Sequence, residues 1–440
     1  MANPQSAIRN PQLKRLVPSL LEWFSASARD LPWRRTRDPY AIWVSEIMLQ
    51  QTQVKTVMPY WDRWMRELPT IEALANASPE KIHKLWEGLG YYTRVRNMQA
   101  AAKQIESGKR KAKNGNAGFP DKFEDVLALP GIGRYTAGAI CSIAFNQPTP
   151  ILDGNVIRVL TRVFGIAENP KEKQTNALLW QIAEKLVSHA SRIPDRESKS
   201  RTRMRTKEED DLSCSHLNQS LMELGALICT PRNPQCAHCP VKKQCVAFKE
   251  SRVNELPNLE KRVAATARQF IAFVVERDGK FLVRQRPESV VNAHLWEFPN
   301  IEIGPRLSQP QRAASRTDSG TSGSPGARSA APGTGAVRRR RLPKPHNADG
   351  GSEYRQSDSV TDIATEFLGT QPASIRRLCA VKHSITRYRI TLEAFHILPS
   401  ETSRLPEGIW LAPSGFEALA FTAAHKKLAS FAANCMLSDP

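Results

Sequence analysis

The sequence predicts a mainly α-helical fold followed by a smaller C-terminal region of mixed α and β structure. Apolar residues recur at helical spacing through most of the helical part. A Pro-Gly-Ile-Gly turn at 130–133 joins two of these helices, and alternating apolar runs around an Asp-Gly pair at 278–279 predict a β-hairpin. A chain of 440 residues can form two or three domains. We place a helical region at 1–250, a linker at 251–268 and an α+β domain at 269–440.

The charge balance favours a polyanionic partner. Lys and Arg number 63 against 43 Asp and Glu, a formal net charge of +20. Nucleic acid is therefore expected ahead of a membrane surface. No apolar run is long enough for a membrane span, and the N-terminus has no apolar signal segment. We expect a cytoplasmic protein that acts on DNA as a monomer.

Glu46 lies on a helix that we expect to run from Pro39 to about Val54, after a first helix at 12–29. Its neighbours at helical spacing are apolar, namely Ile42, Trp43 and Leu49. Desolvation at such a position favours the neutral acid and raises the pKa, as a general acid near neutral pH requires. The alternative is a glutamate at the edge of the apolar stripe that reaches solvent or an arginine.

Three segments carry side chains suited to nucleobases. Trp33 and Arg34, in the loop after the first helix, could stack on and hydrogen-bond a base, or could cover the core and the surface. Gln51 lies in a Gln-Gln-Thr-Gln cluster that suits base contacts or plain surface. Tyr91, in a Gly-Leu-Gly-Tyr-Tyr turn followed by arginines, suits insertion into a base stack. Two core tyrosines are the alternative there.

A helix-hairpin-helix is predicted after a basic, glycine-rich loop at 106–118. An apolar helical stretch runs to Leu129, and Gly131 and Gly133 allow a tight turn that a β-carbon would obstruct. A small-residue helix then follows at 134–145. The free N–H groups at its start point outward, and a DNA phosphate is their natural partner.

Asp153 follows this hairpin in an Ile-Leu-Asp-Gly-Asn-Val segment. A carboxylate beside a phosphate-binding turn is repelled by DNA unless it has a chemical role there. The alternative is an N-cap for the helix expected from Asn155 to Val163. Both interpretations stay open on spacing alone.

Four cysteines form one cluster after helices at 176–190 and 216–228, which a charged tract at 192–211 separates. They are Cys229, Cys236, Cys239 and Cys245. Four thiols in 17 residues indicate one metal site in a reducing compartment rather than a disulfide framework. Zinc is the general interpretation of such a cluster and a four-iron four-sulfur cluster is its rival. His238 is a further possible ligand.

The C-terminal region opens with the predicted hairpin around the Asp-Gly pair. Residues 304–353 are rich in Ser, Gly, Pro and Arg, and we interpret them as a disordered insertion. A short helix is expected at 359–368, strands near 376–382 and 387–396, and a last helix at 423–434.

Together these segments resemble the MutY family of adenine DNA glycosylases, relatives of endonuclease III in the helix-hairpin-helix superfamily. The resemblance covers roughly 12–300 and, more weakly, 354–432. It is carried by WVSEIMLQQTQV, GLGYYTRVRN, LPGIGRYTAGAI, LDGNVIRVL and the four cysteines. It implies a helix-hairpin-helix DNA glycosylase fold with an iron-sulfur loop, plus a C-terminal α+β domain of the Nudix type.

The resemblance also implies a reaction, the removal of adenine mispaired with 8-oxoguanine or guanine in double-stranded DNA. Glu46 would protonate the adenine ring at N7, and Asp153 would stabilise the oxocarbenium-like sugar. The residues that match supporting positions are Tyr135 and Asn155 at the carboxylates, Trp33, Arg34 and Gln219 in the adenine pocket, and Gln51 and Tyr91 in the base stack. Adenine must be flipped out of the duplex first.

Tyr135 carries a second implication. Relatives of the endonuclease III type have a lysine at this position, which attacks the sugar as a nucleophile. The Gly-Arg-Tyr-Thr segment supplies no amine there. The resemblance therefore implies a monofunctional glycosylase without strong lyase activity.

The resemblance assigns one [4Fe-4S] cluster to the four cysteines and 8-oxoguanine recognition to the C-terminal domain. Only Ala-Thr-Glu-Phe-Leu-Gly at 364–369 remains of the Nudix metal helix, so nucleotide hydrolysis is not expected. The family's Phe-Ser-His turn is Ile385, Thr386 and Arg387 here. We expect Thr386 and Arg387 to discriminate oxidised from normal guanine.

Two other classes of protein were weighed. A sister glycosylase could act on oxidised pyrimidines or mismatched thymine, but Tyr135 and the C-terminal domain argue against oxidised pyrimidines. A non-enzymatic, metal-stabilised DNA-binding protein would satisfy the charge and the hairpin. The presence of both Glu46 and Asp153 within complete motifs argues against it.

Overall fold

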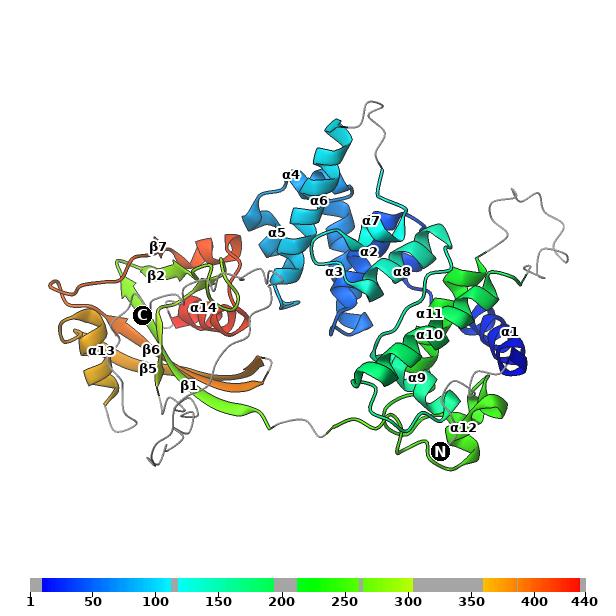
Figure 1. Ribbon diagram of the computed structural model, residues 1–440. Coiled ribbons are helices and arrows are strands. Elements are labelled where there is room, and N and C mark those ends of the chain that lie inside the picture. The colour runs from blue at the N-terminus through cyan, green and yellow to red at the C-terminus, as the bar shows by residue number, and fades with distance from the viewer. Residues whose placement is uncertain are drawn as a thin grey trace, which may run out of the picture. The chain divides into compact units, whose positions relative to one another are not determined.

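The computed structural model of the chain describes residues 10–111, 118–193, 212–260, 264–303, 359–385 and 387–435 (Figure 1). The predicted insertion at 304–353 lies outside these residues. Of the predicted insertion at 192–211, only residues 192 and 193 are described. Over the described ranges, no helix combines the length and the apolar character that crossing a membrane requires.

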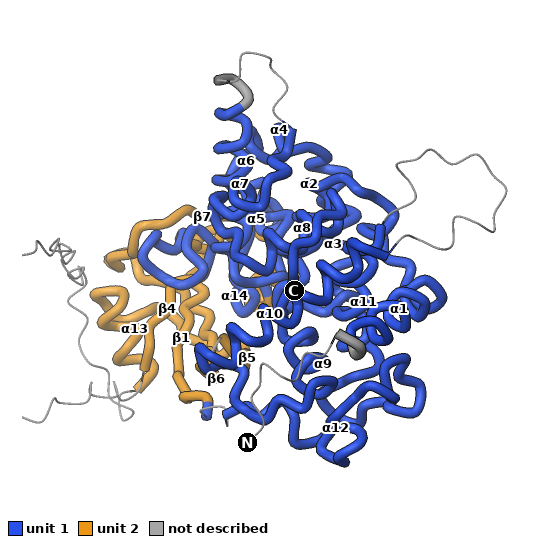
Figure 2. The backbone as a smooth tube through the Cα atoms, turned by 45° about the vertical axis from the view of Figure 1, so that its right-hand side comes forward, with its two compact units in different colours: residues 1–264, 285–297, 414–426 blue, residues 265–284, 298–413, 427–440 orange. Residues whose placement is uncertain are grey.

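The chain forms two compact units, coloured separately in Figure 2. The first comprises Met1–Ala264, Gln285–Glu297 and Ser414–Lys426. The second comprises Ala265–Arg284, Phe298–Pro413 and Lys427–Pro440. The domain boundaries at 250 and 269 remain a prediction.

The first unit is built almost entirely of helices. In chain order they are α1 (Asn10–Ser27), α2 (Pro39–Leu49), α3 (Val54–Glu67), α4 (Ile71–Asn76), α5 (Pro79–Trp86), α6 (Thr93–Lys111), α7 (Phe123–Leu127), α8 (Arg134–Phe145), α9 (Gly154–Phe164), α10 (Lys173–Ala190), α11 (Ser213–Leu227) and α12 (Val246–Lys249). Short 3-10 turns lie at Pro32–Arg34, Cys236–His238 and Lys242–Gln244. The unit also holds the two-residue strand β3 (Trp296–Glu297).

Two helix boundaries differ most from the prediction. Helix α2 begins at Pro39 with Asp38 as its N-cap, as expected, but ends at Leu49 rather than near Val54. It ends there because Gln51 adopts a left-handed backbone with φ of 61°, which a helix cannot contain. Helix α6 continues to Lys111, into the predicted loop at 106–118, because its polar residues tolerate a solvated helix.

Two apolar cores organise the helical unit. One lies around Trp43, Trp64 and Trp86, and the other packs α1, α9, α10 and α11 together. Every residue of α2 from Tyr40 to Met48 is buried. Glu46 is therefore inside the protein, and its predicted alternative at the edge of an apolar stripe is wrong.

The second unit is an α+β structure. Its strands are β1 (Thr266–Arg277), β2 (Lys280–Gln285), β4 (Asn300–Ile303), β5 (Ser374–Ile385), β6 (Tyr388–Leu398) and β7 (Ile409–Leu411). They follow the order β2-β1-β6-β5, with β4 paired to β1 and β7 to β2. Strands β1 and β6 are parallel and β5 and β6 antiparallel.

The predicted hairpin forms between β1 and β2, with Asp278 and Gly279 at φ of 51° and 70°. Helix α13 (Val360–Leu368) begins at a capping box and packs against the sheet, with the Phe367 and Phe273 rings 4.6 Å apart. The last helix is α14 (Ala423–Cys435). The predicted fold class, a helix-hairpin-helix region followed by an α+β region, is confirmed.

Candidate active site

Glu46 and Tyr135 meet between α2 and α8. The Tyr135 hydroxyl donates a hydrogen bond of 2.8 Å to Glu46 Oε2. Glu46 is only 5% exposed, and burial raises its pKa to about 7. The Tyr135 hydrogen bond opposes this rise, whereas the negative charge of Asp153 adds to it. A carboxyl with this pKa is partly protonated at neutral pH, so Glu46 can act as a general acid.

Asp153 is the N-cap of α9, so the capping interpretation is correct. Its Oδ1 accepts from the Val156 N–H at 2.7 Å, and its Oδ2 accepts from Asn155 Nδ2 at 3.1 Å. Burial raises the pKa of Asp153, and these hydrogen bonds oppose the rise. The cap does not exclude a chemical role, because the charge of Asp153 also raises the pKa of both Glu46 and Tyr135.

Arg158 fixes the orientation of Asn155. Its NH2 group donates to Asn155 Oδ1 at 2.8 Å and to the Gly225 carbonyl at 2.7 Å, and its Nε donates to the Cys229 carbonyl at 2.7 Å. Asn155 therefore presents its carbonyl to Arg158 and its NH2 group to Asp153. The same guanidinium connects the Asp153 cap to the start of the cysteine loop.

Glu223, on α11, is a site residue to which sequence reasoning assigned no role. It is 1% exposed and accepts from Nε and NH2 of Arg29 at 2.7 and 2.6 Å. Arg34 adds donors at 3.2 and 2.9 Å. Burial alone would raise the pKa of Glu223, but the hydrogen bonds from the two guanidinium groups hold it at about 2. Glu223 is thus ionised at every physiological pH.

Gln219 and Trp33, the other residues predicted for the base pocket, lie close to members of this ion cluster along the chain. Gln219 lies one helical turn before Glu223 and donates to Ser215 Oγ at 3.1 Å. Met222 Sδ, from the same helix, lies 3.3 Å from the Tyr135 hydroxyl. Trp33 is buried beside Arg34 and packs edge-on against Trp61. The spacing of Glu223 four residues after Gln219 could have indicated its place on the site-facing side of the helix.

A Glu223→Gln variant is expected to lose about 3 kcal/mol of unfolding free energy, because it leaves two guanidinium groups without their buried counter-charge. Urea unfolding of the intact chain measures this. Asp30→Asn is the matched control, since Asp30 pairs with Arg35 in solvent and its loss should change little. Equal stability of the Glu223→Gln variant and the wild type would contradict the expected role.

Gln51 and Tyr91 both have left-handed backbones, with φ of 61° and 49°. Gln51 is exposed, and 49% of Tyr91 is accessible to solvent. The alternative of two core tyrosines holds for Tyr92, which is 5% exposed, and is wrong for Tyr91. A non-glycine residue in this conformation is uncommon and costs free energy, so the surrounding structure must hold it there.

The predicted hairpin joins α7 to α8. Gly131 has φ of 76°, and a β-carbon there would lie 2.6 Å from Asn97 Cβ, so the turn requires glycine at this position. Gly133 is the N-cap of α8 with an extended backbone and open space around it. The prediction that a β-carbon would obstruct the turn is therefore correct for Gly131 and wrong for Gly133.

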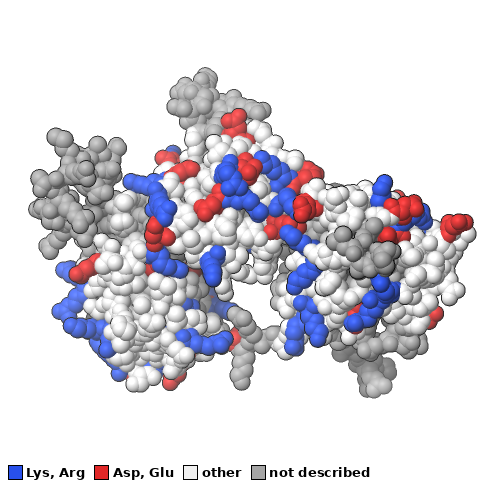
Figure 3. Space-filling view, turned by 180° about the vertical axis from the view of Figure 1, so that it is seen from behind, with Lys and Arg blue, Asp and Glu red and all other residues white. Residues whose placement is uncertain are grey.

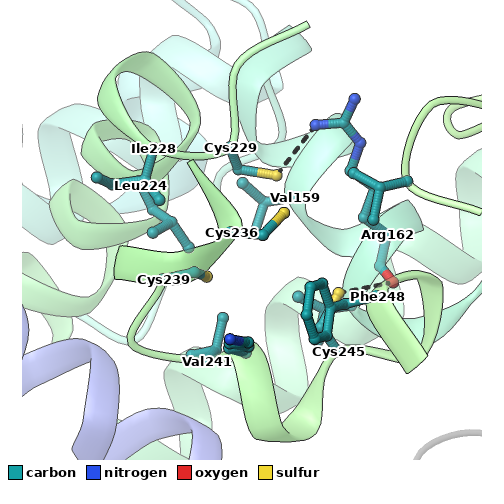
Figure 4. A pocket seen from close by; sticks show the side chains of 13 residues that line it. Val159, Arg162, Leu224, Ile228, Cys229, Cys236, Cys239, Val241, Cys245 and Phe248 are labelled. Carbon is teal, nitrogen blue, oxygen red and sulfur yellow. Dashed lines mark hydrogen bonds between the residues drawn. The ribbon is translucent and has the colours of Figure 1, made fainter. Parts of the chain in front are cut away.

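The four cysteines line one cavity together with Val159, Arg162 and Phe248 (Figure 4). Arg162 NH1 lies 3.4 Å from Cys229 Sγ, and the Arg162 carbonyl accepts from Cys245 Sγ at 3.4 Å. Burial raises the pKa of Cys239 to about 12. The described residues contain no group of three or more Cys, His, Asp or Glu side chains in a metal-binding arrangement. His238 is not among the residues that line the cavity.

Arg387 lies in the turn between β5 and β6, and its Nε and NH2 lie 3.1 and 3.0 Å from the Tyr388 hydroxyl oxygen. Thr386 lies outside the described residues. Lys and Arg side chains, blue in Figure 3, are spread over the face seen from behind, with acidic side chains among them.

Comparisons with known proteins find a matching family and several relatives. The family described as "HhH-GPD superfamily base excision DNA repair protein" matches residues 44–185. The adenine DNA glycosylase of Arabidopsis thaliana is 38% identical over 330 residues, which cover 66% of this chain and 48% of that protein. That of Homo sapiens is 36% identical over 470 residues, 93% of this chain and 72% of the human protein. A solved thermostable thymine-DNA glycosylase is 27% identical with a TM-score of 0.44, covering 55% of this chain and 98% of that one.

The chain thus carries a helix-hairpin-helix base excision repair domain. It belongs to the adenine DNA glycosylase family. It spans about half the length of the Arabidopsis relative that it matches.

Proposed function

We propose that this chain is a monofunctional DNA glycosylase that hydrolyses the N-glycosidic bond of adenine mispaired with 8-oxoguanine or guanine in double-stranded DNA. The observation that carries the proposal is the Glu46–Tyr135 hydrogen bond beside Asp153. One carboxyl has its pKa raised to about 7, and the other is held by N–H donors at a helix N-terminus. Two carboxyls in unequal environments suit the cleavage of glycosidic bonds.

In the proposed reaction Glu46 donates its proton to N7 of the flipped adenine, which makes the base a better leaving group. The C1′–N9 bond breaks, and positive charge develops on the sugar. Asp153 in its ionised form stabilises that charge. Water then adds to C1′ and gives up a proton, which restores the acid form of Glu46, and the products are free adenine and an abasic site. Tyr135 positions Glu46, and Asn155 with Arg158 positions Asp153.

The base pocket of the proposal is built by Trp33, Arg34, Gln219 and Glu223. The Glu223 ion pairs fix the position of the Arg34 guanidinium. A flipped base needs such fixed polar groups on its edge and an apolar face to stack on. Gln51 and Tyr91 would enter the base stack on the opposite strand.

The four cysteines would hold one [4Fe-4S] cluster. Their four thiols line a single cavity, and cysteine thiolates are the ligands that hold such a cluster. The cluster would supply a covalent cross-link of the 229–245 loop and no step of base removal. Arg158 would then connect the ordered loop to Asn155 through the Cys229 carbonyl.

No covalent DNA adduct is expected when the protein is mixed with its substrate and sodium borohydride. Schiff-base chemistry needs an amine at the sugar, and the side chain that contacts Glu46 here is the Tyr135 phenol. Denaturing gel electrophoresis of labelled DNA measures trapping. A lysine-containing glycosylase of the endonuclease III type serves as the positive control, and trapping of this chain to a similar extent would refute the monofunctional assignment.

Changing Thr386 and Arg387 together to Ala is expected to reduce the preference for 8-oxoguanine over guanine opposite adenine about tenfold, as the loss of one or two hydrogen bonds to the base would. The ratio of single-turnover rates on the two duplexes measures it. Arg404→Ala, in the same unit, is the control substitution. An unaltered ratio would show that these two residues do not read the oxidised base.

The proposal itself is tested by single-turnover release of adenine from a duplex with adenine opposite 8-oxoguanine. Duplexes with adenine opposite thymine and with thymine opposite guanine are the controls. Release from the first duplex alone supports the proposed reaction. Release of thymine instead would assign the chain to mismatched thymine.

A further inference from the structure

The two loops proposed to enter the base stack leave the helical core at different places. Gln51 lies between α2 and α3, and Tyr91 lies between α5 and α6. Both residues have left-handed backbones, which the surrounding structure must enforce. Insertion into a duplex from two loops works only if their relative placement is fixed, because a displacement of about 1 Å already impairs catalytic geometry.

One side chain, Arg94 at the start of α6, bonds to both loops. Its NH1 group donates to the carbonyls of Ile47 and Gln50, each at 2.7 Å, and more weakly to Met48 at 3.5 Å. Its NH2 group donates to the carbonyls of Leu89 and Gly90 at 3.0 and 3.2 Å. The first set precedes Gln51 and the second set precedes Tyr91.

The chemistry of Arg94 suits this role. Among the described residues its hydrogen bonds go to carbonyl oxygens, and no carboxylate pairs with it. Burial lowers its pKa to about 10, so it remains charged at pH 7. The charge lies at the C-terminal end of α2, where the helix dipole favours a cation. Its guanidinium also lies 5.3 Å from the Trp86 ring centroid and 5.5 Å from that of Tyr91.

Each loop has hydrogen bonds of its own, such as that from Trp86 Nε1 to the Gly90 carbonyl at 3.0 Å, whereas the Arg94 side chain bonds to both loops. A cavity of about 230 Å³ adjoins Arg94 and lies between α2, α6 and the hairpin, where Ile47, Asn97 and Gly131 line it. Side chains do not fill the space between these elements beside Arg94. The connection between the two loops there depends on the guanidinium and its planar set of donors, which lysine cannot reproduce.

We propose that Arg94 is a positioning residue that holds the Gln51 loop and the Tyr91 loop in one fixed arrangement, so that both side chains enter the duplex together. This rests on the proposed function, because only a base-flipping enzyme needs the insertion. Arg94 acts through the two loops and touches neither adenine nor the sugar.

The test compares Arg94→Lys with the double variant Gln51→Ala/Tyr91→Ala and with the triple combination. Arg63→Lys is the matched control, because Arg63 also bonds a helix-end carbonyl, Leu85 at 2.7 Å, and lies over an aromatic ring, but its side chain bonds to α5 and not to both loops. The first readout is the fluorescence of 2-aminopurine placed beside 8-oxoguanine, which reports unstacking in the bound duplex without any base release. The second is the single-turnover rate of adenine release.

We expect Arg94→Lys to lower the fluorescence increase and the release rate about tenfold or more, and Arg63→Lys to change neither beyond twofold. In the Gln51→Ala/Tyr91→Ala variant the additional Arg94→Lys substitution should lower both readouts less than about threefold, because the two side chains that Arg94 positions are already absent. The positioning role is overturned if Arg94→Lys lowers the readouts equally in the wild type and in the Gln51→Ala/Tyr91→Ala variant, or if it lowers them in neither.

The two proposals fail separately. If the wild type unstacks the duplex and Arg94→Lys does not, yet no adenine is released by either, the positioning role stands and the proposed reaction fails. If the wild type neither unstacks nor cleaves, both are overturned. Thermal unfolding of each variant shows whether a loss reflects the fold instead, and a loss of activity that follows a loss of folded protein counts against the positioning role.

Discussion

An Asp153→Asn variant is expected to release adenine about 10³-fold more slowly than the wild type in a single turnover. The substitution is nearly isosteric and removes the negative charge that the developing oxocarbenium-like sugar requires. It also removes a charge that raises the pKa of Glu46, so the general acid becomes more ionised at neutral pH. Both effects lower the rate, and quantification of released base against time measures their sum.

The structure provides a control that separates charge from fold. An asparagine oxygen can still accept the Val156 N–H bond, so the cap of α9 survives in Asp153→Asn, whereas the bond from Asn155 Nδ2 is lost in Asp153→Asn and Asp153→Ala alike. Asp153→Ala loses the cap as well, and its unfolding free energy should be about 1 kcal/mol lower than that of the wild type. Comparable inactivity of the two variants, with only the alanine variant destabilised, would assign the loss to charge. Release by Asp153→Asn within tenfold of the wild-type rate would contradict the proposed role.

The sequence was most informative where the signal is local. Asp38-Pro39 predicted the start of α2, and the Asp278-Gly279 pair predicted the hairpin between β1 and β2. These features depend on the φ and hydrogen-bonding preferences of a few adjacent residues. Glu46 and Asp153 could be predicted as candidates because short segments around them have a characteristic composition.

Long-range partners could not be predicted in this way. Glu223 binds Arg29 and Arg34 across 194 and 189 positions of the chain, and no local pattern records such a contact. Arg94 bonds backbone carbonyls, which every residue possesses, so its partners leave no sequence signal at all. The end of α2 was missed for a related reason, since the left-handed backbone of Gln51 is imposed by its surroundings.

Two buried glutamates show how partners decide a pKa. Glu46 and Glu223 are 5% and 1% exposed, and burial raises the pKa of both. Glu223 meets two guanidinium groups and its pKa falls to about 2. Glu46 meets the neutral hydroxyl of Tyr135 and the charge of Asp153, and its pKa stays near 7. One glutamate is therefore a fixed anion of the pocket, and the other can give a proton to a bound base.

The rate of adenine release is therefore expected to fall as the pH rises through about 7, approaching tenfold per pH unit above it. Glu46 in the folded chain is protonated below this pH and ionised above it, so only the acidic side holds the proton that adenine needs. The raised pKa of Glu46 also stabilises the folded state. This stabilisation is fully present at pH values below the ordinary pKa of 4.5, and it is lost as the pH rises through about 7. Single-turnover rates between pH 5.5 and pH 9, a range of about 3.5 units, measure the catalytic part.

Two variants identify the group that titrates. Glu46→Gln cannot give up a proton in this range, so its residual rate, lower by about 10²-fold to 10⁴-fold, should not fall with rising pH. Tyr135→Phe removes the hydrogen bond that lowers the pKa of Glu46, so the decline should begin at a higher pH than in the wild type. A decline that Glu46→Gln retains unchanged would show that another group titrates. A decline that moves to lower pH in Tyr135→Phe would show that the hydroxyl acts on Glu46 in some way other than by stabilising its ionised form.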